Sequence, residues 1–335
     1  MTNSDPHIRP VNLRTDLPAL ADLIELVFAP TMDESGRAAI REMRYMSRMG
    51  VGLTVLGRLN EMMLGIKMGY VWIEDGKLIG NVSIYPANLP GGDHHTWIIA
   101  NVGVHPAYQR RGIARRLMEL SLEMLRQRGA RAAILQVDYN NEAAIHLYER
   151  LGFIRERAFA QWQRPNFARV PEPVDTGVFI TRRRRSEWAA ELALAERVRP
   201  NSRGGVGWLK PTVPALFRKT WRDSLSDVLK MASTERLIVR SSDERALLAT
   251  LWLDNQFGVF STRLTLMYLP GMIHAAEALL TNAVRRFRSA TLTLEHPYDD
   301  AEATALFRRL HFSCERTVWH MRLDLLTPAQ PSPTR

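Results

Sequence analysis

Residues 102–114 carry the pattern best suited to chemistry, Val-Gly-Val-His-Pro-Ala-Tyr-Gln-Arg-Arg-Gly-Ile-Ala. An apolar alternation leads into this stretch and predicts a strand, which Pro106 ends because proline has no N–H to donate. Apolar residues at helical spacing, from Ile113 to Met124, then predict a helix that stops at Gly129. The start of a helix has unpaired backbone N–H groups and the positive end of the helix dipole, so this turn is suited to bind an anion.

Three residues of the turn favour an anion as its ligand. Gly112 has no Cβ, so a phosphate can approach the backbone there, and Arg110 and Arg111 add positive charge. The turn is not a nucleotide P-loop, which requires Gly-Lys-Ser/Thr, nor a dinucleotide fingerprint, which requires three spaced glycines. A simple packing turn before a helix is the alternative that these residues alone leave open.

A second segment follows with its own helix signals. Asn141 begins a helix that runs through Leu147 and Tyr148 and ends at Gly152.

Both segments resemble signatures of the GNAT N-acetyltransferase superfamily. Gln109-x-x-Gly112-x-Ala114, directly after Val104-x-Pro106-x-Tyr108, resembles that family's acetyl-CoA pyrophosphate loop, and residues 141–153 are similar to its second signature. The resemblance covers residues 8 to about 164 and is strongest over 98–153. It implies an α/β fold, with a mixed sheet and helices on both faces.

The resemblance assigns roles to the first segment. The strand residues Val102, Gly103 and Val104 would splay from the neighbouring strand at a bulge, and their free amides would bond the pantetheine arm and the thioester oxygen. Gly103 suits either a bulge or a close backbone approach. The residues that would hold the pyrophosphate are Gln109, Arg110, Arg111, Gly112, Ile113, Ala114 and Arg115.

Asn141 and Tyr148, in the second segment, can each be interpreted in two ways. By the resemblance Asn141 contacts the pantetheine arm, but asparagine is also a preferred helix N-cap. Tyr148 matches the family's general acid, which protonates the sulfur of coenzyme A, and it could equally be a buried aromatic. A phenol with a pKa of about 10 is protonated at neutral pH.

The sequence offers no obvious general base. Many members of the family use a glutamate on the central strand or on the next one, where this chain has Ala100, Asn101 and Gln136. His105 lies just beyond the strand and is expected to be exposed. A water relay without a dedicated base is a further alternative. The remaining candidates are Glu74, His94, His95 and the acidic pair Asp33-Glu34.

The other expected elements follow from periodicity and turn residues. A strand and a helix are expected over 8–29, a helix over 31–49, a hairpin over 71–85, a central strand over 131–137, and a closing pair of strands at 153–154 and 159–162.

Composition describes an ordinary globular protein. The chain has 335 residues, 46% of them hydrophobic, a net charge of +10 and one cysteine, Cys314. It has no apolar run of the roughly 18 residues that a membrane helix needs and no secretion signal at its start, so we expect a cytoplasmic protein. Arg182 to Arg185 form the sharpest basic run, but solvated surface explains the charge better than nucleic-acid binding, and no metal-ligand spacing occurs.

The chain also contains an internal repeat. A shift of 159 positions places Leu147 to Phe153 on Leu306 to Phe312, Asn141 on Asp300, and Gly112 on Gly271, without a gap from Asn101 onward. We therefore expect a catalytic GNAT domain over 1–164, a linker over 165–174, a degenerate GNAT-like copy over 175–326, and a disordered tail over 327–335.

The second copy lacks the chemical groups of the first. In the ungapped alignment Gln109-Arg110-Arg111 becomes Tyr268-Leu269-Pro270, Tyr148 becomes Phe307, and Val102 and Val104 become Ser261 and Arg263. The expected role of the second copy is a scaffold and a wall for the substrate.

The leading hypothesis is an acetyl-CoA-dependent N-acetyltransferase without a metal. A primary amine, on a small molecule or a peptide, would attack directly in a ternary complex. The alternatives are transfer of another acyl group from its CoA ester and a non-catalytic acyl-CoA sensor. No membrane partner is expected, and a homodimer is left open.

Overall fold

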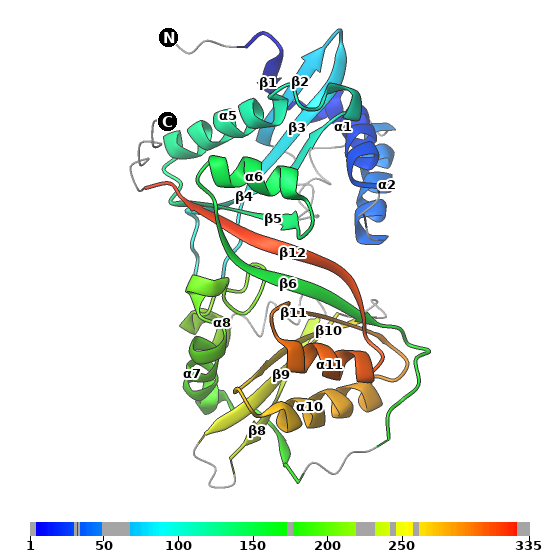
Figure 1. Ribbon diagram of the computed structural model, residues 1–335, viewed down its shortest axis with the longest axis vertical. Helices are drawn as coiled ribbons and strands as arrows, with labels where there is room; N and C mark the ends of the chain where they lie inside the picture. The colour runs from blue at the N-terminus through cyan, green and yellow to red at the C-terminus, as the bar shows by residue number, and fades with distance from the viewer. Residues whose placement is uncertain are drawn as a thin grey trace.

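The computed structural model describes residues 5–29, 32, 34–48, 68–172, 177–218, 232–241, 246–256 and 261–326. Twelve strands form one sheet in the order β1-β2-β3-β4-β5-β12-β6-β11-β10-β9-β8-β7 (Figure 1). The main elements of the first half are β1 (Ile8–Pro10), α1 (Leu13–Phe28), α2 (Glu34–Arg48), β2 (Met68–Glu74), β3 (Lys77–Pro86), β4 (Thr96–Val104), α5 (Ile113–Gln127), β5 (Ala132–Asp138), α6 (Glu142–Arg150) and β6 (Ile154–Arg164). Those of the second half are β7 (Ile180–Arg182), α7 (Trp188–Val198), α8 (Pro214–Phe217), β8 (Ala232–Arg240), β9 (Leu247–Gln256), β10 (Ser261–Tyr268), α10 (Ile273–Arg286), β11 (Thr291–Pro297), α11 (Ala301–Arg309) and β12 (Ser313–Asp324).

Helices cover both faces of the first half's sheet. On one face Leu117 and Ile145, from α5 and α6, pack with Val82 of β3. On the other face Leu20 of α1 and Val71 of β2 share a separate core cluster with residues of α2. The expected α/β fold with a mixed sheet is confirmed. No helix among the described residues is long and apolar enough to cross a membrane.

The last strand of each half lies in the sheet of the other half. β12 lies between β5 and β6, and β6 pairs with β12 and β11 (Figure 1). The expectation of two closing strands at 153–154 and 159–162 is therefore wrong: one long strand, β6, crosses to the second half. Without this exchange, neither half would have the strand that neighbours its own β5 or β11.

The 159-residue spacing of the repeat is present in the structure after the two aligned glycines, Gly112 and Gly271. β5 and β11 begin 159 residues apart, as do α6 and α11. Asn141 and Asp300 cap these two helices through the same contact, accepting the N–H of Ala144 and Ala303 at 3.1 and 3.0 Å. The helices of both copies are therefore built on one local pattern.

The ungapped alignment is wrong for the strand before that glycine. The parallel pair starts at Thr96 with Ala132 in the first copy and at Ser261 with Thr291 in the second, so Thr96 corresponds to Ser261. Seven residues separate β4 from Gly112, whereas only two separate β10 from Gly271. The second copy thus lacks most of the loop, not merely its charges.

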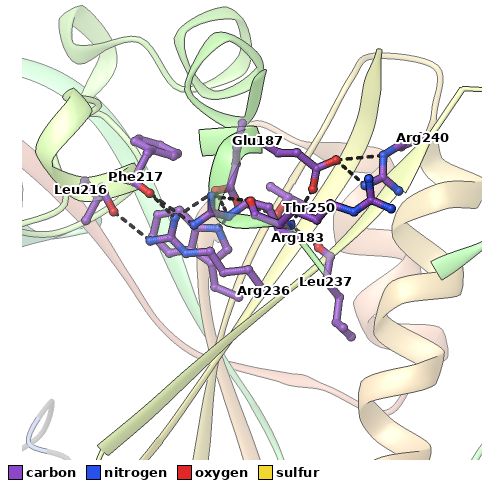
Figure 2. A network of polar contacts seen from close by, with 11 residues as sticks. Arg183, Glu187, Leu216, Phe217, Arg236, Leu237, Arg240 and Thr250 are labelled. Atoms are coloured by element: carbon purple, nitrogen blue, oxygen red, sulfur yellow. Dashed lines mark hydrogen bonds and ion pairs between the residues drawn. The ribbon is translucent and has the colours of Figure 1, made fainter. Parts of the chain in front are cut away.

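Buried ion pairs fasten α7 to the strands of the second half. Arg183 and Arg236 both reach the carboxylate of Glu191, at 3.0 and 2.9 Å, and Figure 2 shows them converging beside Thr250. Arg236 also lies 4.1 Å from the ring centroid of Trp252. The first half has a simpler version, in which Arg9 of β1 pairs with Asp16 of α1 at 2.6 Å.

This network accounts for part of the basic run at 182–185. Arg182 pairs with Glu235 at 2.6 Å and Arg183 with Glu191. Two of the four arginines thus take part in ion pairs within the protein, although Glu191 is shared with Arg236 and Glu235 with Arg286.

Candidate active site

The site begins where β4 and β5 separate. They pair only from Thr96–Ala132 to Ile98–Ile134, although β4 continues to Val104 and β5 to Asp138. Beyond Ile98 the β5-facing edge of β4 has no strand partner among the described residues. Backbone groups along an open strand edge can pair with an extended ligand.

A β-bulge on β4 causes this separation. Ala100 lies opposite Ser83 and Gly103 opposite Asn81, so β4 has one residue more than β3 over this interval. Asn101 takes the extra turn with φ +51°. The predicted bulge is present, but it lies at Asn101–Val102 and not at Gly103.

Gly103 has a different neighbour. A Cβ added there would lie 3.4 Å from Cε2 of Phe28 and 3.5 Å from Cγ1 of Val27, both on α1. Both are side-chain atoms at ordinary van der Waals distances, so the structure shows neither a bulge nor a close backbone approach at Gly103.

Side-chain amides hold the bulge in place. Asn81 donates to the backbone carbonyl of Asn101 at 3.0 Å, and both amides lie 3.3 Å from the hydroxyl of Ser83. Asn81 and Ser83 are each 1% exposed. This cluster was not anticipated from the sequence, because the bulge that joins its members depends on pairing between β3 and β4.

The loop between β4 and α5 presents a row of free N–H groups. Arg110 and Gly112 both have positive φ, +62° and +78°. Within the described chain the backbone N–H groups of residues 110–115 donate no hydrogen bond, and the first helical one comes from Arg116 to Gly112 at 3.0 Å. Apart from its chain neighbours, no atom of the described residues lies within 4 Å of a Cβ added at Gly112. Six successive donors thus border open space, an arrangement that binds anions.

The arginines of this loop differ in their partners. Arg111 forms two hydrogen bonds with Glu74, at 2.9 and 3.1 Å, and lies over the ring of Tyr108. Arg115 pairs with Glu119 at 2.8 Å. Arg110 makes no ion pair within the described part of the chain, so its charge is the least compensated. Gln109 donates to the carbonyl of Val104 at 3.2 Å and thereby ties the loop to the strand.

Tyr148 lies in the core between α6 and the loop. It is 6% exposed, belongs to the same cluster as Val104 and Ile113, and has its ring 6.0 Å from that of Phe153. Its hydroxyl makes no hydrogen bond with the described residues. Burial raises the pKa of Tyr148 well above its ordinary value, so the phenol is protonated at neutral pH.

Asn141 is the N-cap of α6, as one of its two interpretations predicts. Its Oδ1 accepts the N–H of Ala144, while its amide nitrogen has no partner among the described residues. The capping contact leaves that nitrogen available to a ligand.

The expected base candidates lie in different places. Glu74 is bound to Arg111 at the anion loop. His95 is exposed, whereas His105 is half-buried and not exposed as expected, because its Nδ1 accepts the N–H of Ala107 in the turn that follows. His94 lines a cavity of about 430 Å³ between the two halves, together with Asn88, Leu89, Pro90, Asp93, Leu209, Lys210 and Leu216. Asp33 and the side chain of Glu34 lie outside the described residues.

The second half of the chain also supplies residues beside the place where β4 and β5 separate. Trp208 and Leu209 pack on Ile98 and Ile134, the last residues that pair β4 with β5. On the neighbouring strand β12, His320 is buried with its Nε2 3.0 Å from Nε2 of Gln136. His320 could not be found from the sequence, because only the strand exchange brings it to β5.

A polar network fills the corresponding place in the second copy. The hydroxyl of Tyr268, at the end of β10, donates to Asp300 at 2.7 Å, and Asp300 also lies 2.9 Å from Nε2 of His296. Arg199 completes the network at 3.0 Å from Nδ1 of His296. Burial lowers the pKa of His296 to about 4, so this imidazole is neutral.

Comparisons with known proteins agree with this geometry. Residues 58–153 match the model of the Acetyltransferase (GNAT) family. N-alpha-acetyltransferase 30 of Schizosaccharomyces pombe is 34% identical over 89 residues, which are 27% of this chain and 59% of that protein. A mycothiol acetyltransferase of Thermomonospora curvata is 39% identical over 93 residues, 27% of this chain and 29% of that protein. The matched segments thus span well under two thirds of these relatives.

Solved structures resemble the whole chain in fold. A GCN5-related N-acetyltransferase from Sphaerobacter thermophilus has a TM-score of 0.58 and 14% identity, with 96% of both chains covered. A tandem GNAT protein from the clavulanic acid biosynthesis pathway has a TM-score of 0.50 and 15% identity, covering 96% of this chain and 99% of that one. The family match shows that residues 58–153 belong to a GNAT domain, and the solved structures show that the described chain carries the GNAT fold twice.

Proposed function

We propose that the first copy, residues 1–164 completed by β12, transfers an acetyl group from acetyl-CoA to a primary amine. The observation that carries this proposal is the row of six unpartnered N–H groups at residues 110–115, beside open space at Gly112. Such a row suits a pyrophosphate, which offers several acceptor oxygens and negative charge. The uncompensated charge of Arg110 adds to it.

The remaining parts of acetyl-CoA fit the opening between β4 and β5. The amide groups of a pantetheine arm can pair with the free edge of β4 as an added strand would. The same edge, at Val102 to Val104, offers fixed N–H dipoles to the thioester oxygen. These dipoles stabilise the negative charge that develops on that oxygen when the amine attacks.

Tyr148 would act on the departing sulfur. Its raised pKa lies above the value of about 8.5 for a thiol, so the phenol keeps its proton more firmly than a thiol does. Tyr148 therefore stabilises the thiolate by donating a hydrogen bond. If its proton moves to sulfur, the proton lost by the amine must restore the phenol, so that the net transfer runs from nitrogen to sulfur.

The acceptor is a small molecule or a peptide. Among the relatives, one is named for mycothiol and another, [Ribosomal protein bS18]-alanine N-acetyltransferase of Escherichia coli, for a ribosomal protein. The latter is 47% identical over 53 residues, 16% of this chain and 36% of that protein. We place the acceptor against the face where Trp208 and Leu209 cover Ile98 and Ile134.

Thiol release tests the proposal. The protein is mixed with acetyl-CoA and a panel of small and peptide amines, and free coenzyme A is measured over time. Turnover with at least one amine is expected. Tight binding of acetyl-CoA without thiol release from any amine would instead identify an acyl-CoA sensor, and faster release from a longer acyl-CoA would correct the acyl group.

A further inference from the structure

A chain of three polar side chains links the second copy to the opening in the first. Gln136 of β5 lies 3.0 Å from Nε2 of His320 on β12, and the same ring nitrogen lies 3.3 Å from Oε1 of Glu295 on β11. His320 is 2% exposed and stacks on Phe159 at 4.4 Å. A carboxylate that holds the proton on one imidazole nitrogen also sets the orientation of an amide that meets the same nitrogen.

Gln136 stands beside the opening. It lies two residues beyond Ile134, the last residue of β5 that pairs with β4, and on the same face of the sheet. His320 faces it from the β12 side. The end of the Gln136 amide that does not meet His320 has no hydrogen-bond partner in the described chain, so it is available to a ligand.

Hydrogen-bond accounting selects one of the two orientations of this amide. If the NH2 group of Gln136 faces His320, the ring nitrogen Nε2 must accept and cannot carry a proton. Oε1 of Glu295 would then be buried without a hydrogen bond, facing a lone pair. If the carbonyl of Gln136 faces His320 instead, one Nε2–H serves both Glu295 and Gln136, and the buried carboxylate oxygen is satisfied.

Glu295 is ionised and held in place. Burial alone would raise its pKa, but the contact with His320 and the N–H of Trp208, which donates to Oε2 at 2.9 Å, hold the pKa of Glu295 below its ordinary value. A Cβ added at Gly207 would lie 2.6 Å from the same oxygen, so the loop closes tightly over the carboxylate. The carboxylate therefore demands a donor from His320.

Glu156 is the competing carboxyl group. It is the extra residue at a bulge in β6, and its Oε2 and Nδ1 of His320 lie 3.8 and 3.7 Å from the point where Gly204 lacks a Cβ. Burial raises the pKa of Glu156 and so disfavours its carboxylate form, whereas the carboxylate form of Glu295 is stabilised. Lys210 is the remaining charged group beside Glu295, and it pairs with Asp254 at 3.5 Å.

We propose that Glu295 and His320 of the second copy fix the Gln136 amide with its NH2 group toward the opening between β4 and β5, where it donates a hydrogen bond to an oxygen of the acceptor. The acceptor is then an amine with a carbonyl, carboxylate or hydroxyl oxygen near the nitrogen. Gln136 contacts the substrate, whereas Glu295 and His320 are positioning residues. The substrate contact rests on the proposed function, but the amide orientation does not.

The tautomer of His320 tests the orientation without any substrate. In the full chain labelled with ¹⁵N-histidine, the His320 signals are assigned by their loss in His320→Gln and, independently, by their displacement in Gln136→Leu. The proton is expected on Nε2. Glu295→Gln should move a substantial fraction of it to Nδ1, whereas Glu156→Gln, the matched control, should not. A proton on Nδ1 in the natural protein, or no response to Glu295→Gln, would overturn the proposal.

Steady-state kinetics test the substrate contact. Gln136→Leu and Glu295→Gln are expected to raise the KM for the amine about tenfold, the size of one neutral hydrogen bond, and to leave the KM for acetyl-CoA unchanged. Gln163→Leu, on β6, is the matched control, because the Gln163 side chain is exposed and makes no hydrogen bond with the described residues, so it should have no effect. An unchanged amine KM with the expected tautomer would overturn the contact. No turnover with any amine would overturn the proposed function and leave the orientation supported.

Discussion

The opening between β4 and β5 and the corresponding place between β10 and β11 differ in what occupies them. In the first copy the two strands separate after Ile98 and Ile134, and a loop of unpaired N–H groups follows. In the second copy the loop is shortened, and Tyr268, His296 and Arg199 form a buried network. The comparison shows that one fold can leave this gap open or fill it with buried side chains, and only an open gap could admit a ligand.

The largest expected effect comes from the paired glycines. Gly112→Val should weaken acetyl-CoA binding more than 100-fold, because a branched side chain would stand in the open space and strain a backbone with φ +78°. Gly271→Val imposes the same strain at φ +79°, about 1–2 kcal/mol of stability, but should leave binding unchanged. Calorimetric titration and thermal unfolding measure both quantities.

The outcome of this pair decides which copy binds the cofactor. Retained affinity in Gly112→Val would move the pyrophosphate elsewhere. Lost affinity in Gly271→Val, with normal thermal stability, would assign it to the second copy.

The next effect concerns the two tyrosines. Tyr148→Phe should lower kcat about 100-fold, the lower end of what proton-donating groups contribute, and should leave acetyl-CoA affinity unchanged. Tyr268→Phe removes a buried hydroxyl with two contacts to Asp300, so it should cost about 1–3 kcal/mol of stability and no turnover. Single-turnover kinetics at saturating acetyl-CoA measure the first change. Full activity of Tyr148→Phe would make that side chain a core residue only.

Low pH should destabilise the protein through the buried histidine of the second copy, His296. The pKa of His296 is about 4 in the folded protein and about 6.5 when unfolded, so its contribution is complete above pH 6.5 and is lost as the pH falls toward 4. Between pH 7 and 5 this group should account for about 2 kcal/mol of lost stability. Chemical denaturation of the natural protein and of His296→Gln isolates that share, because the variant should have the flatter pH dependence. Equal slopes would mean that His296 titrates normally.

The sequence predicted what depends on local signals. The helix starts at Asn141 and Asp300 and the glycines at 112 and 271 follow from capping and backbone preferences, which act within a few residues. The glycine turn and the helix start could therefore be predicted from nearby residues alone, whereas anion binding by residues 109–115 stays a prediction.

The sequence could not predict what depends on pairing across the sheet. The spacing between Thr96 and Ser261 differs from the 159-residue spacing between α6 and α11 by an even number of residues. An even shift leaves the alternation of inward and outward side chains in a strand unchanged, so the sequence does not reveal it. The exchange of β6 and β12 is equally hidden, because the two strands have related sequences and either could pair with β5. His320 and Glu295 were missed for this reason.

The smallest expected effect concerns the balance of charge at the anion loop. Glu74 accepts two hydrogen bonds from Arg111. Glu74→Gln should therefore free the guanidinium of Arg111 for the cofactor and remove a negative charge beside the loop. Acetyl-CoA should bind a few-fold more tightly, since an exposed ion pair is worth about 0–1 kcal/mol. Glu119→Gln is the control, because Glu119 holds Arg115 one turn into α5 and should change affinity less. Weaker binding in Glu74→Gln would instead mean that Glu74 holds Arg111 in its binding position. Titrations at two salt concentrations would separate the two cases, because a purely electrostatic gain shrinks as salt increases.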